Sequence, residues 1–187
     1  AMDIVLSGMV IDKAEHNKLL TDTVSSLGEA PASPADNLPR LLLLASECDD
    51  RDIVDFVESI GACVVVDEHC NGTRYFWGDV SPNGDMLSAI ADRYVDRPPC
   101  PHKDVTSPQH LRLDHVLDLA SQWRVQGAVI VQQKFCDPYR YEMPKMEAML
   151  RENGIPTVML EAEFTMPAGQ FRTRVEAFLE TIQQEML

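Results

Sequence analysis

The sequence lacks any excess of positive charge. Its 187 residues include 16 lysines and arginines against 30 aspartates and glutamates, and the formal net charge is −14. Because a phosphate backbone needs a basic face, this balance argues against nucleic acid as a partner. An anionic ligand would have to be held by a local group of cations against an unfavourable overall field.

Long hydrophobic runs are also missing. No segment approaches the roughly 20 apolar residues that cross a bilayer, and no basic segment followed by an apolar one resembles a secretion signal. Hydrophobic residues make up 45% of the chain and charged residues 25%, as in an ordinary globular protein. We therefore expect a cytoplasmic protein with no membrane partner, built as one domain or one domain with an appendage.

The sequence lacks the cysteine spacing of a disulfide framework or a zinc ribbon. The five cysteines are an odd number at irregular intervals, and no Cys-x-x-Cys pair is present. We therefore expect reduced thiols. The cysteines are Cys48, Cys63, Cys70, Cys100 and Cys136.

Several catalytic signatures are absent as well. The sequence contains no G-x-S-x-G, no G-x-x-x-x-G-K-[ST] and no G-x-G-x-x-G. These patterns mark a serine nucleophile on a strand-to-helix turn, a P-loop and a dinucleotide-binding turn. Serine hydrolase, P-loop and classical NAD-binding functions are therefore improbable for this chain.

Four nearly continuous apolar runs predict a buried parallel sheet, since strands covered on both faces do not alternate with polar residues. Helical patterns separate the runs. This order predicts an α/β fold with a doubly wound, four-stranded parallel sheet flanked by helices, of the Rossmann or flavodoxin-like kind. The runs are 41–45, 63–66, 128–131 and 157–160, and the helical patterns lie near 51–60, 84–95, 108–124, 140–153 and 169–187.

An N-terminal helix is expected ahead of this domain. Asp12 is a suitable N-cap with Glu15 three residues later, which resembles a capping box. A proline-rich stretch over 30–39 reads as a linker. We therefore expect a helix and linker at 1–39, belonging with a missing preceding region, and an α/β domain at 40–187. The helix, 13–27, carries an apolar stripe of Leu19, Leu20, Val24 and Leu27.

Three cysteines follow predicted strands. Cys48, Cys70 and Cys136 each come shortly after an apolar run. Ligands of open parallel sheets bind at the carboxyl ends of the strands, so these thiols are expected along one edge. A thiol presented there is more typical of a metal ligand or a nucleophile than of core packing. Cys136 is the most prominent, because an Asp-Pro turn directly follows it.

Other interpretations of these residue types stay open. A cysteine often fills space as a small hydrophobe, and this is the interpretation for Cys63 inside its strand. Cys100 and His102 offer only two metal ligands without further partners. Arg74 and Lys134 are the cations nearest the strand-end turns and are candidates for substrate binding, although isolated cations usually lie on a solvated surface.

Two motifs resemble those of a known enzyme family. The segment 69–76, HCNGTRYF, is similar to a Cys-x-Gly-x-Arg-Tyr turn, and the segment 134–139, KFCDPY, is similar to a cluster-cysteine motif. The segments 153–161 and 170–178 resemble the last strand and helix of the same family, and 12–20 resembles the helix before its second α/β domain. The family comprises the 2-hydroxyacyl-CoA dehydratases and the ATP-dependent benzoyl-CoA reductases.

The resemblance implies a C-terminal domain of such a subunit, working in anaerobic metabolism. In this family two homologous subunits pair as a heterodimer, each with a [4Fe–4S] cluster, and an ATP-dependent activator protein supplies an electron. The dehydratases form a ketyl radical on the thioester carbonyl of a 2-hydroxyacyl-CoA and expel the hydroxyl group. The reductases reduce an aromatic ring instead. Thiolates are the expected iron ligands.

The sequence departs from this family in one respect. Each cluster takes three cysteines from its subunit, two of them from a preceding domain that this sequence lacks. Only Cys136 matches a cluster-cysteine motif of the family. Cys70 is a second candidate ligand of the cluster, and Cys48 ranks after Cys70. We therefore expect no stable cluster and no activity in this chain alone. The alternatives are a benzoyl-CoA reductase-type subunit and a non-catalytic α/β binding or electron-transfer module, and no catalytic residue is assigned.

Overall fold

A single parallel sheet forms the centre of the protein. The computed structural model describes residues 2–28, 37–48, 51–96, 100–101, 110–163 and 168–185. The spatial order of the strands is β2-β1-β3-β4, and each neighbouring pair is parallel. The predicted four-stranded parallel sheet is therefore confirmed. The strands are β1 (Arg40–Ala45), β2 (Cys63–Glu68), β3 (Gly127–Gln133) and β4 (Thr157–Ala162).

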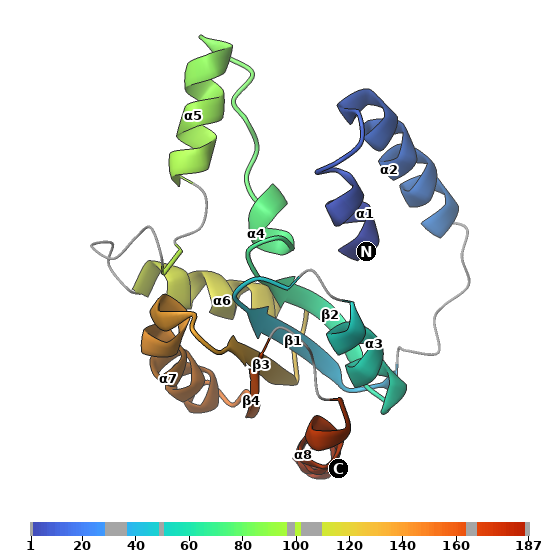
Figure 1. Ribbon diagram of the computed structural model, residues 1–187, viewed down its shortest axis with the longest axis vertical. Helices are drawn as coiled ribbons and strands as arrows, with labels where there is room; N and C mark the ends of the chain where they lie inside the picture. Colours follow the sequence, from blue (N-terminus) through green and yellow to red (C-terminus); the bar gives the residue numbers. More distant parts are fainter. Residues whose placement is uncertain are drawn as a thin grey trace.

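Helices cover both faces of this sheet (Figure 1). Leu41 and Leu43 of β1 belong to the core cluster under α3 and α8, whereas Leu42 and Leu44 belong to the cluster under α6 and α7. Successive strand residues point to opposite faces, so β1 serves two cores at once. This is the doubly wound arrangement that the sequence predicts. The helices are α3 (Asp52–Ser59), α6 (His110–Gln122), α7 (Asp137–Glu152) and α8 (Ala168–Glu185).

Burial of β1 explains its unbroken run of leucines. Leu41, Leu42, Leu43 and Leu44 are each at most 1% exposed. Each such side chain stabilises the fold by roughly 1.5–3 kcal/mol relative to exposure. A polar residue at any of these four positions would face a helix layer on one side of the sheet or the other. Neither face of the strand is open to solvent, so apolar and polar residues do not alternate along it.

Two of the remaining helices, α2 and α5, stand away from the sheet, whereas the short helix α4 packs against β2 (Figure 1). The expected helix is present as α2, and Asp12 Oδ1 caps it by accepting hydrogen bonds from the Ala14 and Glu15 backbone N–H groups. Its apolar stripe is exposed, and no residue of α2 is buried. No helix in the described part of the chain is long and apolar enough to cross a membrane. These helices are α1 (Met2–Ser7), α2 (Lys13–Leu27), α4 (Thr73–Phe76) and α5 (Met86–Asp96).

Three local expectations differ from the structure. The helix expected from about residue 140 begins at Asp137, because Pro138 lies in its first turn, where the missing N–H needs no partner. The second strand extends to Glu68, two residues beyond its apolar run. Cys63 is the partly exposed first residue of β2 rather than an interior strand residue.

Candidate functional site

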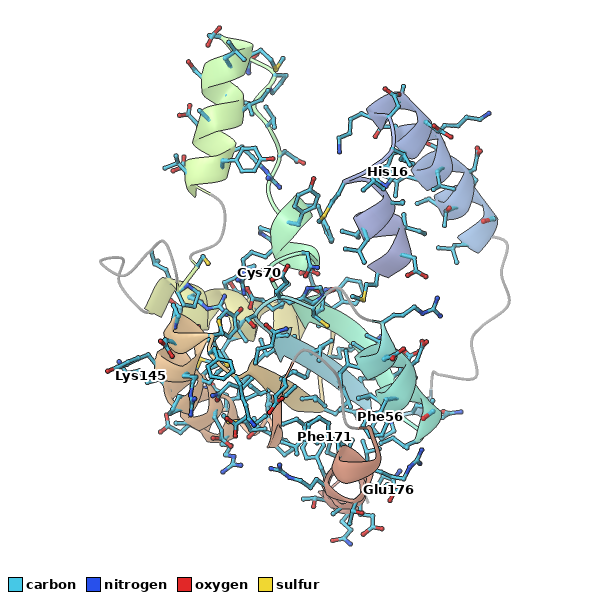
Figure 2. The ribbon with its side chains drawn as sticks, in the orientation of Figure 1. His16, Phe56, Cys70, Lys145, Phe171 and Glu176 are labelled. Atoms are coloured by element: carbon cyan, nitrogen blue, oxygen red, sulfur yellow. The ribbon has the colours of Figure 1, made fainter. Side chains whose placement is uncertain are left out.

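Hydrogen bonds join the carboxyl ends of β1, β2 and β3. The Cys70 backbone N–H donates to the Ser46 carbonyl oxygen at 2.7 Å. Ser46 Oγ donates to Gln133 Oε1 at 3.2 Å, and Gln133 Nε2 donates to the Glu47 carbonyl oxygen at 2.9 Å. Cys70 lies at this end of the sheet, close to α4 (Figure 2). The strand ends therefore form one edge, as the parallel topology requires.

The turn that carries Cys70 is held by side chains of its own segment. Asp67 Oδ1 accepts a hydrogen bond from the Thr73 backbone N–H at 2.7 Å. Asn71 Oδ1 accepts one from the Cys48 backbone N–H at 3.0 Å and lies 2.9 Å from His69 Nδ1. Such bonds from Asp and Asn side chains to nearby backbone are typical of tight turns.

Gly72 in this turn is packed too closely for a side chain, which gives a testable prediction. A Cβ at Gly72 would lie inside contact distance of Asp67 Oδ1 and the His69 ring. Gly72→Ala is therefore expected to lower the free energy of unfolding by about 1–3 kcal/mol in urea denaturation. Gly169→Ala is the matched control, because nothing lies within 4 Å of a Cβ in that helix. Equal stability of the Gly72 variant and the wild type would contradict the prediction.

A buried charge network lies below this edge. The carboxylate of Glu68 is 0% exposed and accepts hydrogen bonds from two guanidinium groups. Arg74 donates through Nε and Nη2, both at 2.6 Å, and Arg112 donates through Nη1 and Nη2 at 2.6 and 2.8 Å. Arg112 Nε also donates to Glu142 at 2.5 Å, and both arginines donate to the Tyr139 hydroxyl. Two positive and two negative charges thus balance.

The pKa values of Glu68, Arg74, Arg112 and Tyr139 are shifted by burial and by the charges of their neighbours. Burial alone would raise the pKa of Glu68, but the charges of Arg112 and Arg74 outweigh it and lower the pKa to about 2. Burial would lower the pKa of Arg74 and of Arg112, yet Glu68 keeps both raised. Burial, followed by the charge of Glu68, raises the pKa of the Tyr139 phenol. At neutral pH Glu68 is therefore a carboxylate, Arg74 and Arg112 are guanidinium ions, and Tyr139 is a neutral phenol.

Two thiols lie against the same guanidinium. Arg74 Nη1 is 3.5 Å from Cys70 Sγ and 3.9 Å from Cys100 Sγ. Burial raises the pKa of Cys70, Arg74 opposes this rise, and Cys100, Glu68 and Cys136 add to it. Cys136 is therefore an electrostatic neighbour of Cys70. It is partly exposed at the N-cap of α7, after the end of β3, as predicted.

The other predicted site residues are placed apart from one another. Cys48 is buried in the core cluster on the α3 and α8 side, whereas Cys136 packs on the α6 and α7 side. Lys134 is surface-exposed and pairs with Glu163 at 2.8 Å. Arg74 is only 1% exposed, unlike an ordinary solvated cation. Within the described ranges, no group of three or more His, Cys, Asp or Glu side chains is arranged to hold a metal ion.

The sequence interpretation missed most of the charge network. Sequence patterns predict no role for Arg112 or Glu68, and Tyr139 enters only as the last residue of KFCDPY. Cys100 is a candidate only together with His102, which lies outside the described residues. A signal for Arg112 exists, because it precedes the buried Val116 by four residues on α6 and so shares its inner face. No local sequence pattern predicts that Arg112 pairs with Glu68, because the two residues are 44 positions apart.

Backbone strain lies directly before Cys136. Phe135 has a φ of 71°, a left-handed conformation that a bulky residue rarely adopts. Its side chain is 82% exposed, so burial of the ring does not offset the strain. Such strain persists only when the surrounding structure holds it in place, and it is enriched at functional sites.

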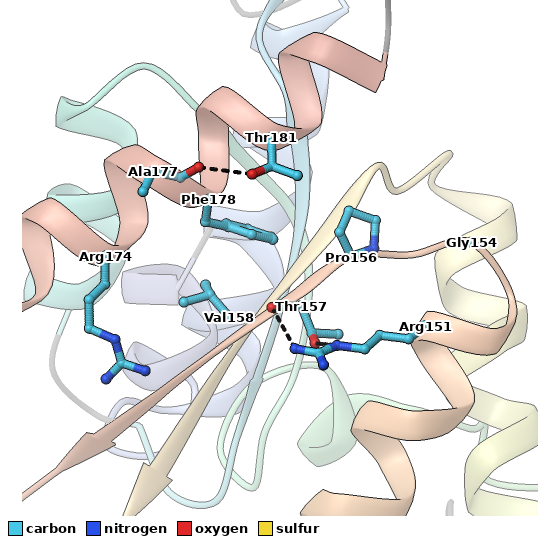
Figure 3. A pocket seen from close by; sticks show the side chains of 9 residues that line it. All are labelled: Arg151, Gly154, Pro156, Thr157, Val158, Arg174, Ala177, Phe178 and Thr181. Carbon is cyan, nitrogen blue, oxygen red and sulfur yellow. Dashed lines mark hydrogen bonds between the residues drawn. The ribbon is translucent and has the colours of Figure 1, made fainter.

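A separate pocket lies at the opposite end of the sheet (Figure 3). It has a volume of about 560 Å³ and adjoins the start of β4, whereas Cys70 and Cys136 lie beyond the carboxyl ends of β2 and β3. Arg151 and Arg174 flank it, and each already donates to a β4 backbone carbonyl. The pocket is lined by Arg151, Gly154, Pro156, Thr157, Val158, Arg174, Ala177, Phe178 and Thr181.

The fold and the strand-end site define a doubly wound α/β domain with cysteines presented at the carboxyl edge of its sheet. The chain belongs to the family described as 2-hydroxyglutaryl-CoA dehydratase, D-component, which matches residues 1–182. The family resemblance predicted from the HCNGTRYF and KFCDPY segments is therefore confirmed.

Three relatives illustrate the range of this family. The chain is 23% identical over 180 residues to the (R)-phenyllactyl-CoA dehydratase beta subunit of Clostridium sporogenes, covering 96% of the chain and 47% of the relative. It is 21% identical over 183 residues to a benzoyl-CoA reductase subunit of Thauera aromatica, covering 96% and 47%. It is 21% identical over 172 residues to the lactoyl-CoA dehydratase beta subunit of Anaerotignum propionicum, covering 91% and 45%. The chain thus spans about half the length of these relatives.

Proposed function

We propose that this chain is the C-terminal α/β half of an iron–sulfur 2-hydroxyacyl-CoA dehydratase subunit, which removes water from a 2-hydroxyacyl-CoA by a radical route. The supporting observation is Cys136, which lies in the KFCDPY segment beyond the end of β3 and is partly exposed at the N-cap of α7. The family and the dehydratase names of two relatives support the reaction class.

The residues of this chain fit one corner of a [4Fe–4S] cluster rather than its whole ligand set. Cys136 supplies one thiolate, the soft ligand that iron–sulfur clusters require. Cys70 is a second candidate, held against Arg74, while Cys48 faces the other core. When bound, the cluster supplies an electron and a Lewis acid for the thioester carbonyl. The remaining thiolates come from another part of the subunit.

The proposal includes partners. The named relatives are themselves subunits, and this supports a homologous second subunit as a partner. We further propose an ATP-dependent activator protein as a second partner and a CoA thioester as the substrate. The proposed location is the cytoplasm. Lys134 lies exposed near Cys136 and is the candidate contact for the anionic CoA. Arg74 is buried and its guanidinium is hydrogen-bonded to Glu68, so we propose that it supports the site from within the domain and does not contact the substrate directly.

The test is anaerobic iron–sulfur reconstitution of the complete subunit together with its partner subunit. We expect about four iron and four sulfide per cluster site, and water loss from a 2-hydroxyacyl-CoA once an electron donor is supplied. A complete subunit pair that takes up no iron would overturn the proposal. It would then favour a non-catalytic α/β binding or electron-transfer module, since fold alone does not fix function.

A benzoyl-CoA reductase-type subunit is the second candidate. The observation that favours it is the match to the benzoyl-CoA reductase subunit of Thauera aromatica, which covers as much of the chain as the phenyllactyl-CoA dehydratase match. The same reconstituted enzyme separates the two. Consumption of benzoyl-CoA with formation of a reduced ring, and no turnover of 2-hydroxyacyl-CoA thioesters, would select the reductase.

The chain of 187 residues alone is expected to bind no stable cluster. Only Cys136 matches the family motif, and the described residues contain no group of three ligands, so iron would be left under-coordinated. The measurement is iron, sulfide and visible absorbance after anaerobic reconstitution, with the complete subunit pair as the positive control. Stoichiometric iron and sulfide in the isolated chain would instead favour a ligand set of Cys48, Cys70 and Cys136 within this domain.

A further inference from the structure

Tyr139 lies one turn after Cys136 and is the buried residue of that turn. It is 0% exposed, and its hydroxyl accepts hydrogen bonds from Arg74 Nη2 and Arg112 Nη2. The two guanidinium carbons lie 5.6 and 5.3 Å from the centre of its ring, close enough for cation–π attraction. The first turn of α7 is therefore held through one aromatic side chain.

The two arginines are themselves fixed, because Glu68 binds both through paired hydrogen bonds. Paired contacts between guanidinium and carboxylate fix orientation as well as distance. Glu68 ends β2, Arg74 lies in α4 and Arg112 in α6. Arg112 also reaches Glu142, one turn further along α7. The network therefore joins β2, α4 and α6 to α7, and a movement of α7 would disrupt charged contacts that are largely shielded from water.

The backbone around Cys136 requires such support. Phe135 is strained at a φ of 71°, and the Cys136 N–H makes a long 3.3 Å hydrogen bond to the Gln133 carbonyl oxygen. Strain of this kind relaxes unless neighbouring contacts oppose it. Arg74 also touches Cys70 Sγ, so the guanidinium that holds Tyr139 connects the Cys70 turn with the Cys136 turn.

We propose that Tyr139 is a positioning residue for Cys136, acting through Arg74 and Arg112 with Glu68 as their common anchor. The hydroxyl of Tyr139 holds the α7 N-cap, and with it the Cys136 thiol, in one position relative to the Cys70 turn. The role of Cys136 as an iron ligand rests on the proposed function. The positioning itself rests on the geometry of this chain alone.

The first experiment measures alkylation of each thiol by iodoacetamide, resolved by mass spectrometry, in the 187-residue chain. Tyr139→Phe removes one hydroxyl and keeps the ring, and the Cys136 rate is expected to rise about tenfold through local opening of the turn. Cys63 serves as the internal control and keeps its rate. Tyr141→Phe is the matched variant, because Tyr141 lies on the same helix and is 87% exposed, and it changes no rate.

A second variant addresses the arginine contact. Arg112→Lys keeps the positive charge but loses the fork that joins Glu68 to Tyr139, and the same selective rise at Cys136 is expected. An unchanged Cys136 rate in both variants would overturn the proposal. An equal rise at all five cysteines would overturn it too, because that result reports general loosening of the fold.

A third measurement separates this proposal from the proposed function. In the reconstituted complete subunit pair, Tyr139→Phe is expected to retain iron but to shift the electron paramagnetic resonance signal of the reduced cluster. If Cys136→Ser keeps full iron while the alkylation result holds, the ligand assignment fails and the positioning role stands. If Cys136→Ser loses iron but Tyr139→Phe changes neither alkylation nor the resonance signal, the positioning role fails alone.

Discussion

Glu68→Gln is expected to lower the free energy of unfolding by about 3–5 kcal/mol, because it leaves two buried guanidinium ions without their shared carboxylate. Arg74 and Arg112 would retain the Tyr139 hydroxyl, and Arg112 would retain Glu142, but Glu142 is itself partly exposed. A loss of this size is a large share of the roughly 5–15 kcal/mol that stabilises a typical domain. Urea denaturation followed by circular dichroism measures it.

The pH dependence gives this prediction a second readout. The pKa of Glu68 is lowered from 4.5 to about 2 in the folded chain. The unfolded chain therefore takes up the proton first, so this contribution to stability is present above pH 4.5 and is lost as the pH falls from 4.5 towards 2. Glu68→Gln should flatten the stability profile in this window.

Asp55→Asn provides the control for Glu68→Gln. Asp55 pairs with Arg51 at 3.1 Å, but both side chains are more than half exposed. Exposed pairs contribute about 0–1 kcal/mol, so this variant should unfold close to the wild-type midpoint. If Glu68→Gln unfolded within about 1 kcal/mol of Asp55→Asn, the charge network would not have the structural role that its burial indicates.

Cys136→Ser in the complete subunit pair is expected to abolish turnover and to lose or convert one cluster. A serine hydroxyl is a harder and more basic ligand than a thiolate, so it holds iron poorly. The measurements are activity and iron content, both normalised to folded protein. This result depends on the proposed function, whereas the stability of Glu68→Gln does not.

The controls for Cys136→Ser are two other cysteines. Cys63→Ser should retain activity and iron. A hydroxyl without a partner at a buried site costs about 1–3 kcal/mol of stability. Cys63 lies at the partly exposed start of β2, where water reaches the new hydroxyl, so a smaller loss of stability is expected. Cys100→Ser should also retain iron. Full activity and full iron in the Cys136 variant would remove the basis of the cluster assignment.

The sheet and its order of elements followed from the sequence, because burial on both faces leaves a local mark. Strands such as β1 and β3 are covered by helices on either side, so nearly every position in them is apolar. Parallel topology then places every strand end on one edge. The position of Cys136 beyond β3 was predictable for this reason, and the KFCDPY and HCNGTRYF segments identified the family.

The short elements were not predictable in the same way. The helices α1 and α4 span six and four residues, too few for a helical apolar period to stand out. The start of α7 at Asp137 could not be predicted, because Asp137-Pro138 is equally typical of a turn and of the first turn of a helix. Only contacts with the rest of the domain decide between these two outcomes.

The sequence by itself determined the fold class, the family and the edge at which Cys48, Cys70 and Cys136 lie. The tertiary structure alone decided which side chains meet there. Glu68 and Arg112 are 44 residues apart and carry charges that usually indicate solvated surface, yet they form a buried pair. Cys48 and Cys136 both follow strands but belong to opposite cores. Strand-end position follows from chain order, whereas the face and the partner of a side chain depend on packing between distant segments.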